Sequence, residues 1–395
     1  MQLVAYGAQD IYLTGNPQIT FFKVVYRRHT NFSMESIQQT FNGTVGYGKS
    51  VTATISRNGD LVSEMHLQTT LTAPTTGTGA LHSYFTNGVG NALIETVELE
   101  IGGQTIDKHY SEYLDIWSEL NVSASQKDGY DKMVGNYNSQ PGLENNNTAP
   151  TLYIPLRFWF NRNPGLALPL IALQYHEVKV KMDFRTAAKM AKQTGGTTST
   201  TASATDPTLT NLWVNYIYLD TDERRRFAQV SHEYLIEQVQ FTGDVNSSPT
   251  LSTNLNLNHP VKELNWVCVS DTNRTATTLT GNNWLNYNHS DDDVFTTAKL
   301  VLNGHDRFSA RNAAYFRLIQ NYNHHTCVPR KYIYTYSFAL KPEEHQPSGT
   351  CNFSRIDNAK LTFTGLNGST TLKVFATNYN VLRIMSGMGG LAYSN

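Results

Sequence analysis

TVELEIGGQTIDKHYSEYLDIWSELN, residues 96–121, combines in one segment the strand, turn and helix patterns from which the architecture of this 395-residue chain can be predicted. Its beginning alternates strictly, because Val97, Leu99 and Ile101 are apolar and the residues between them are glutamates. Such alternation predicts a strand with one face buried and the other in water. Gly102 and Gly103 then end the strand, since glycine readily adopts the positive φ angles of a tight turn.

A helix is predicted from the end of this stretch, and a similar helix is predicted about half a chain later. Its apolar residues have the i, i+3, i+4, i+7 spacing of one buried helical face: Tyr113, Ile116, Trp117 and Leu120. The segment ARNAAYFRLIQNY repeats that spacing at an offset of 202 residues (315 minus 113), with Tyr315, Leu318, Ile319 and Tyr322. Upstream, LEIGGQ corresponds to LVLNGH. A tandem duplication explains this offset, and chance similarity of common elements is the alternative.

Strands dominate the rest of the chain. EVKVKMDF (177–184) repeats the one-sided alternation, whereas WVNYIYLD (213–220) is apolar on both faces and is expected to be more deeply buried. YIYTYSFAL (332–340) places three tyrosines and a phenylalanine on one face, which indicates core or subunit contact. We therefore predict an all-β chain in two halves, with the boundary at DERRRF (222–227).

Three long polar segments interrupt the predicted strands. They are residues 122–150, 193–210 and 270–293, which are rich in Asn, Ser, Thr and Gly. Long loops on a β scaffold usually project outward and carry function. We expect these three loops to decorate the exterior of the protein or to lock neighbouring copies together.

The composition excludes several classes of protein. The net charge is -1 and only 16% of the residues are charged, so we expect no direct binding to a genome. The chain has no apolar run of about 18 residues that could span a membrane, and its first residues lack the pattern of a signal peptide. Three cysteines give no disulfide framework, and Cys268, inside the strand pattern WVCVS, is expected to be buried.

Catalytic and cofactor motifs are absent from the sequence. The chain lacks GxSxG, GxxxxGK[ST] and CxxC, and no two of its twelve histidines are separated by a single residue. In HEYLIEQ, which starts at His232, the second zinc ligand is replaced by Ile236. The cluster Asp291 to Asp293 is interpreted as an acidic turn rather than a calcium site. We predict no catalytic residue, no cofactor and no metal site.

Nine Asn-x-Ser/Thr triplets occur in the sequence. Because a chain this rich in Asn, Ser and Thr produces such triplets by accident, they are only weak indications of glycosylation. The candidate acceptors are Asn246, Asn273 and Asn288.

GNPQITFFKVVYRRHTNFS, residues 15–33, is an adhesive segment near the chain start. Asn16 and Pro17 are good first residues of a helix, so we predict a short helix or tight arm, followed by a strand from Phe32 to Phe41. Aromatic side chains are costly to leave hydrated, at about 1.5–3 kcal/mol each. We expect the arm to dock on its own domain or on a neighbour. Candidate assembly contacts are Phe21, Phe22, Tyr26, Arg27 and Arg28.

Four long strings resemble one known family. They are GAQDIYLTGNPQITFFKVVYRRHTNFS (from Gly7), SRNGDLVSEMHL (from Ser56), NRNPGLALPLIALQYHEVKV (from Asn161) and QPSGTCNFSRIDNAKL (from Gln346). They resemble the major capsid protein of nucleocytoplasmic large DNA viruses, most closely those of algal phycodnaviruses. The similarity runs from the first ten residues to the last fifty and leaves out the three polar loops.

This resemblance implies a fold and a domain organisation. The family consists of two consecutive eight-stranded jelly-roll β-sandwiches with short helices in the connecting loops. For this chain the expected division is an N-terminal arm at 1–30, a first jelly roll at 31–220 and a second at 221–395.

The resemblance also implies a function and partners. Members are structural, non-enzymatic subunits that trimerise into pseudo-hexagonal capsomers, and the capsomers tile the icosahedral outer shell of a large double-stranded DNA virus. Expected partners are further copies of the chain, minor capsid proteins and a penton protein. An internal membrane lies next to the shell without being spanned. The implied location is the virion, after synthesis and assembly in the host cytoplasm, with the arm facing inward toward minor capsid proteins.

A carbohydrate-active β-sandwich, either a glycosidase or a lectin, is the competing hypothesis. Aromatic-rich sheets with scattered Asp and Glu are compatible with sugar binding, and two carboxylates could serve as acid and base. Such an enzyme should present a cleft with convergent carboxyl groups and a perturbed pKa. The structure can therefore be searched for that cleft.

Overall fold

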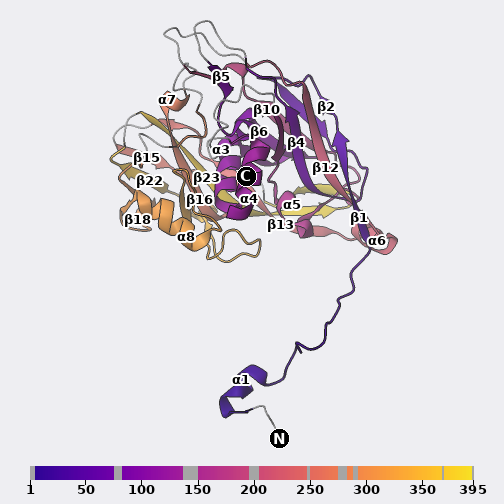
Figure 1. Ribbon diagram of the computed structural model, residues 1–395. Coiled ribbons are helices and arrows are strands. Elements are labelled where there is room, and N and C mark those ends of the chain that lie inside the picture. Colours follow the sequence, from indigo (N-terminus) through magenta and orange to yellow (C-terminus); the bar gives the residue numbers. More distant parts are fainter. Residues whose placement is uncertain are drawn as a thin grey trace.

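The computed structural model describes residues 5–74, 82–136, 150–194, 204–246, 250–274, 283–287, 292–366 and 369–393. Two β-rich bodies lie side by side, and the N-terminal arm extends away from both of them (Figure 1). The first body contains strands β1 to β12 and the second contains β13 to β24.

The first body is a sandwich of two antiparallel sheets. One sheet has the order β1 (Phe32–Gln39), β12 (Leu209–Leu219), β4 (Leu61–Thr70), β8 (Thr151–Pro155), with β9 (Leu168–Pro169) also on β4. The other has the order β2 (Phe41–Asn42), β3 (Ser50–Thr54), β10 (Val178–Phe184), β6 (Ile94–Ile101), β7 (Gln104–Tyr110). A separate pair joins β5 (His82–Phe85) to β11 (Ala191–Thr194).

The second body repeats this arrangement. One sheet has the order β13 (His232–Phe241), β23 (Thr370–Met385), β16 (Pro260–Ser270), β20 (Tyr334–Ser337), with β14 (Val245–Asn246) and β24 (Met388–Leu391) on β23 and β21 (Cys351–Asn352) on β16. The other has the order β15 (Thr250–Asn254), β22 (Ala359–Thr364), β17 (Thr297–Leu302), β18 (His305–Asp306), with β19 (Arg311–Asn312) on β17. Corresponding strands take corresponding places, so the expectation of two consecutive jelly-roll sandwiches is confirmed.

The predicted alternation is visible in the register of the strands. β6 pairs with β10 so that Val97 lies opposite Met182 and Leu99 lies opposite Val180, and all four side chains are buried. The charged residues between them point to the other face, where Lys181 contacts Glu100. Both strands therefore have one wet face, as predicted.

Short helices lie in the connections, as expected. They are α1 (Ile11–Thr14), α2 (Val89–Leu93), α3 (Ser111–Asn121), α4 (Ala124–Val134), α5 (Trp159–Arg162), α6 (Thr221–Gln229), α7 (Asp271–Arg274) and α8 (Gln320–His324). A π-helical turn, Tyr315–Ile319, leads directly into α8. The 3-10 turns are Ala8–Asp10, Pro164–Leu166, Ala187–Lys189 and Phe353–Arg355.

The hydrophobic core of the first sandwich continues into the second. Val267, Val269 and Phe375 belong to strands of the second sandwich but pack in one cluster with the first. A second cluster fills the interior of the second sandwich, where Trp266 stacks on Tyr334. Cys268 is buried in this interior, as expected. The two sandwiches thus share a buried contact surface, which we call the seam.

The two predicted helices have different surroundings. In α3 the predicted face is confirmed, because Tyr113, Ile116 and Leu120 are buried. In the second helix the predicted burial is wrong, since Leu318 and Tyr322 are exposed. The second sandwich covers the face of α3, whereas the corresponding face of the π turn and α8 is left open by the described part of the chain.

Two local predictions are also wrong. Residues 122–150 are not one long loop, because α4 occupies Ala124–Val134; residues 137–149 lie outside the described part. No helix starts at Asn16. Instead α1 precedes it, and Asn16 has a φ of 51°, a left-handed conformation that ends helices rather than starting them. The strand expected from Phe32 is present as β1.

Candidate functional site

The N-terminal arm, residues 5–31, exposes the predicted assembly contacts to solvent. Phe22 is 98% exposed, and Phe21 and Tyr26 are almost as open. Arg27 and Arg28 are exposed beside them. The arm lies far from both sandwiches in Figure 1, so the alternative that it docks on its own domain is wrong.

Local hydrogen bonds shape the arm. The backbone N–H of Gly7 donates to Asp10 Oδ2 at 2.8 Å, and Thr14 Oγ1 donates to the Asp10 carbonyl at 2.7 Å. These bonds hold the single helical turn α1, but they bury none of the apolar side chains. The arm therefore leaves a contiguous set of large apolar side chains in solvent, which is typical of an interaction site.

The seam between the sandwiches is organised by α3. This helix follows β7 directly and ends against the second sandwich, where the backbone N–H of Cys327 donates to the Leu120 carbonyl at 3.1 Å. The ring centroids of Tyr113 and Phe375 are 5.9 Å apart. The helix thus carries apolar contacts from the first sandwich to the second.

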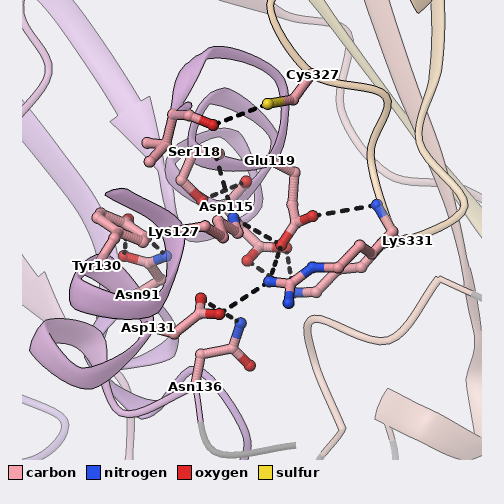
Figure 2. A network of polar contacts seen from close by, with 12 residues as sticks. Asn91, Asp115, Ser118, Glu119, Lys127, Tyr130, Asp131, Asn136, Cys327 and Lys331 are labelled. Carbon is pink, nitrogen blue, oxygen red and sulfur yellow. Dashed lines mark hydrogen bonds and ion pairs between the residues drawn. The ribbon is translucent and has the colours of Figure 1, made fainter. Parts of the chain in front are cut away.

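Ion pairs reinforce the seam (Figure 2). Lys331 Nζ lies 2.7 Å from both carboxylate oxygens of Asp115, and Tyr287 donates to the same carboxylate at 2.9 Å. Arg330 lies 2.9 Å from Asp131 and 3.6 Å from Glu119. Two cations of the second sandwich are therefore held by acids of α3 and α4.

The electrostatics of these acids reflect both burial and pairing. Burial alone would raise the pKa of Glu119, but Lys331 and Lys127 outweigh it and the pKa lies below its usual value. Burial raises the pKa of Asp115, only partly opposed by Lys331. At the other end of α3, burial opposes but does not cancel the effect of Lys373, 2.8 Å away, and the pKa of Glu112 is lowered. Glu112 and Glu119, whose pKa values are lowered, therefore remain charged in their ion pairs.

The seam residues were not predicted from the sequence, although the spacing of the acids in α3 is a signal of them. Glu112, Asp115 and Glu119 lie at i, i+3 and i+7 on a helix that also carries a buried apolar face. Acids at that spacing share one helical face. A stripe of acids beside a buried apolar face indicates cationic partners, but the sequence does not identify Arg330, Lys331 and Lys373.

A cavity of about 350 Å³ lies at the seam. A glycosidase would need its two catalytic carboxyl groups in such a cavity. The seam cavity is lined by Glu237, Glu263 and Glu343. Glu237 lies 2.8 Å from both Arg162 and Lys262, so its charge is balanced.

The other two carboxylates flank His325, at 3.2 Å for Glu263 and 3.1 Å for Glu343. Despite burial, His325 and other partners lower the pKa of Glu263 to about 2. The pKa of Glu343 is lowered as well. A general acid needs a raised pKa, so these groups form ion pairs that hold structure, and the cavity gives no support to a glycosidase.

The remaining sequence candidates are placed as follows. Asn246 ends β14, Asn273 lies in α7 and donates to the Asn286 carbonyl at 3.4 Å, and Asn288 lies outside the described residues. Asp293 is bound by Arg317 at 2.9 Å, whereas Asp291 is not described. Among the described residues, no group of three or more His, Cys, Asp or Glu could hold a metal ion.

Comparison with known families and proteins gives matches along the whole chain. A family model described as major capsid protein N-terminus matches residues 20–220, and one described as large eukaryotic DNA virus major capsid protein matches residues 223–390. The major capsid protein of Pyramimonas orientalis virus is 54% identical over all of this chain and 99% of the relative. That of Paramecium bursaria Chlorella virus 1 is 45% identical over the same shares.

Solved structures give the same result. A chain from a quasi-atomic model of the PBCV-1 virus capsid has a TM-score of 0.79 and 40% identity, covering 95% of this chain and 100% of that chain. The Faustovirus major capsid protein has a TM-score of 0.79 at 14% identity, covering 96% and 94%. The second similarity concerns the fold alone.

Proposed function

The chain belongs to the major capsid proteins of large eukaryotic DNA viruses, and from this premise we propose that three copies form a pseudo-hexagonal capsomer. It is a structural subunit of a viral capsid and therefore a component of the virion. The observation that carries the trimer is the repeated strand order of two sandwiches joined by a buried seam. Three such pairs supply six similar wedges around one axis, a closed symmetric arrangement.

We further propose the division of the chain into an arm at 1–30, a first jelly roll at 31–220 and a second at 221–395. The strand pairings support it, because strands up to β12 pair among themselves and those from β13 onward do likewise. Helix α6 lies between the two sets and exposes Arg224 and Arg225.

The proposed partners follow from the exposed arm. Apolar residues together with Lys23, Arg27 and Arg28 suit an inner surface made by minor capsid proteins, which is where we place the arm. A penton protein is the proposed partner at the vertices, and the internal membrane is proposed to lie adjacent. No helix among the described residues is long and apolar enough to cross it. The net charge of -1 supports the absence of direct genome binding.

We propose no catalytic activity for this protein, and assembly in the host cytoplasm. The paired carboxylates of the seam cavity support the first of these proposals. A cavity whose three glutamates are all engaged in ion pairs is suited to rigidity rather than proton transfer.

Light scattering coupled to size-exclusion chromatography tests the trimer. The expected mass is three times the 44.3 kDa of one chain. A protein that stays at 44.3 kDa at every concentration would contradict the proposed function. Glycan hydrolysis by that monomer would restore the carbohydrate hypothesis.

A further inference from the structure

The two sandwiches correspond strand by strand and also in the hairpin before the helix. The turn between β6 and β7 has Gly102 at φ 59° and Gly103 at φ 86°. The turn between β17 and β18 has Asn303 at φ 49° and Gly304 at φ 80°. Helix α3 follows the first hairpin, and the π turn with α8 follows the second. The surface of α3 can therefore be compared residue by residue with that of α8.

Equivalent residues on the two helices have opposite exposure on one face only. Leu120 is 1% exposed, whereas its counterpart Tyr322 is 78% exposed. Ile116 is buried, whereas its counterpart Leu318 is exposed, and Ile319 beside it is exposed as well. On the opposite side Phe316 is buried, as its counterpart Leu114 is. The exposed side chains Leu318, Ile319 and Tyr322 form what we call the α8 face.

The start of α3 is covered by two strands of the second sandwich, β13 and β23, whereas its last turn meets the segment at Cys327. Tyr110 beside α3 has its ring centroid 4.6 Å from that of Phe241 on β13. Tyr113 lies against Phe375 on β23, and Lys373 on the same strand pairs with Glu112. The strands that cover α3 are therefore the edge strand of a sheet and its neighbour.

In the first sandwich, β1 is the corresponding edge strand and β12 is its neighbour. The order β1-β12-β4-β8 matches β13-β23-β16-β20. SEMHL in β4 aligns with KELNW in β16, and Met65 lies opposite Val214 as Leu264 lies opposite Ala376. Trp213, next to Val214, thus corresponds to Phe375, next to Ala376.

In the first sandwich the same side of β1 and β12 is open, and Gln38, which pairs with Trp213, takes the place of Phe241. Phe32 and Met34 on β1 are both more than half exposed and lie on the same side of the strand. Trp213 is half-buried, with its indole N–H donating to Gln68 at 2.7 Å. We call Phe32, Met34 and Trp213 the β1 face. Figure 1 shows α8 and β1 at opposite sides of the molecule.

We propose that the α8 face of one copy docks on the β1 face of a second copy, as α3 docks on β13 and β23 within each chain. The proposal rests on the proposed function, because it requires that copies associate. The contact joins two different surfaces, and such a contact closes into a ring when the rotation between copies allows it. Large exposed apolar groups on both surfaces provide the driving force.

The charges differ between the seam and the proposed contact. Where α3 carries Glu112, Asp115 and Glu119, the corresponding positions after 202 residues are Ala314, Arg317 and Asn321. Arg317 is engaged by Asp293 within its own sandwich. The contact between copies is therefore mainly apolar, and salt should weaken it little.

Four proteins test this contact by light scattering. They are the wild type, an α8-face variant (Ile319→Asp with Tyr322→Asp), a β1-face variant (Met34→Asp) and a control (Tyr175→Asp). Tyr175 is 75% exposed and therefore matches Tyr322 in exposure. The α8-face variant is expected to associate at least about 100-fold more weakly than the wild type, and the control unchanged. Circular dichroism should show that all four are folded, since each substituted side chain is exposed.

Mixing the two defective variants gives the sharper result. The α8-face variant keeps an intact β1 face, and the β1-face variant keeps an intact α8 face. One molecule of each can therefore form a single contact, so a heterodimer is expected and no larger species. An α8-face variant that keeps the wild-type mass would overturn the proposed contact while leaving the proposed function standing. So would a mixture that contains no heterodimer. A wild type that is monomeric would overturn both.

Discussion

Lys331 Nζ lies 2.7 Å from both oxygens of the Asp115 carboxylate, which joins a cation of the second sandwich to a buried helix of the first. The Asp115 side chain is almost completely buried and that of Lys331 is largely so. A charge that loses its partner in such a place cannot be rehydrated without opening the seam. The pairing therefore ties the two sandwiches together at a buried point of the seam.

Lys331→Ala is accordingly expected to lower the free energy of unfolding by about 3–5 kcal/mol, because it removes the cation that balances the buried Asp115 carboxylate. Thermal unfolding followed by circular dichroism measures the effect. Lys341→Ala is the matched control, since Lys341 pairs with Glu344 at the exposed surface and should cost below about 1 kcal/mol. Equal losses for the two variants would contradict the role of the seam pair. Replacing both partners, as in Asp115→Leu with Lys331→Met, should recover much of the loss.

His325 predicts a pH dependence of stability. Burial lowers its pKa, but Glu263 and Glu343 outweigh burial and raise it from 6.5 to about 9. The folded state then binds a proton more tightly than the unfolded state. The stabilisation, about 3 kcal/mol from this shift, is fully present below pH 6.5 and is lost as the pH rises through about 9.

His325→Gln removes this titration, so the variant should lose less stability than the wild type between about pH 6 and about pH 10. The thermal midpoint across this range measures it. The ring nitrogens of His325 lie 3.2 Å from Glu263 and 3.1 Å from Glu343, so the variant loses both charged contacts. Parallel curves for wild type and variant would show that His325 does not carry the effect.

Removal of residues 1–30 is expected to leave both sandwiches intact. The arm's described residues are exposed apart from the partly buried Asp10, and their hydrogen bonds join sequence neighbours, so the free energy of unfolding should change by no more than about 0.5 kcal/mol. Assembly of capsomers into shells should be impaired, because Phe21, Phe22 and Tyr26 are lost. Electron microscopy of the assembled particles tests this. Shells of wild-type yield and shape from the truncated chain would refute the inward-contact role of the arm.

Local patterns predicted the parts of the fold that local chemistry controls. The alternation at Val97 and Leu99 and the helical spacing at Tyr113 are satisfied within the first sandwich and its seam. The same spacing at Tyr322 predicted a burial that the structure contradicts, because no segment in the described part of the chain covers that side chain. The seam cations could not be predicted, since Lys331 lies 216 residues from Asp115 and no local pattern encodes that separation.

The arm illustrates the same distinction. Asn16 has good helix-starting chemistry, yet its backbone is left-handed and the helix ends before it. An arm without a packed neighbour adopts its local conformational preferences, and several residue types compete in that choice. The composition of the arm predicts a segment for assembly, and this stays a prediction that shell formation can test.

Two glycines in the corresponding hairpin turns of the two sandwiches, Gly102 and Gly304, are expected to respond unequally to substitution. Gly102 and Gly304 both have positive φ angles, so alanine should cost about 1 kcal/mol at each from the backbone alone. A Cβ on Gly102 would lie 2.4 Å from His176 Nδ1, whereas one on Gly304 would meet no atom within 4 Å.

His176 cannot move away freely, because its Nδ1 lies 3.0 Å from the Gly389 carbonyl and holds the C-terminal hairpin. Gly102→Ala should therefore lower the thermal midpoint clearly more than Gly304→Ala, and it should increase hydrogen exchange in β24. Hydrogen–deuterium exchange with mass spectrometry locates the loosened segment. If the two alanine variants melted at the same temperature with β24 equally protected, the steric contact with His176 would not control this turn.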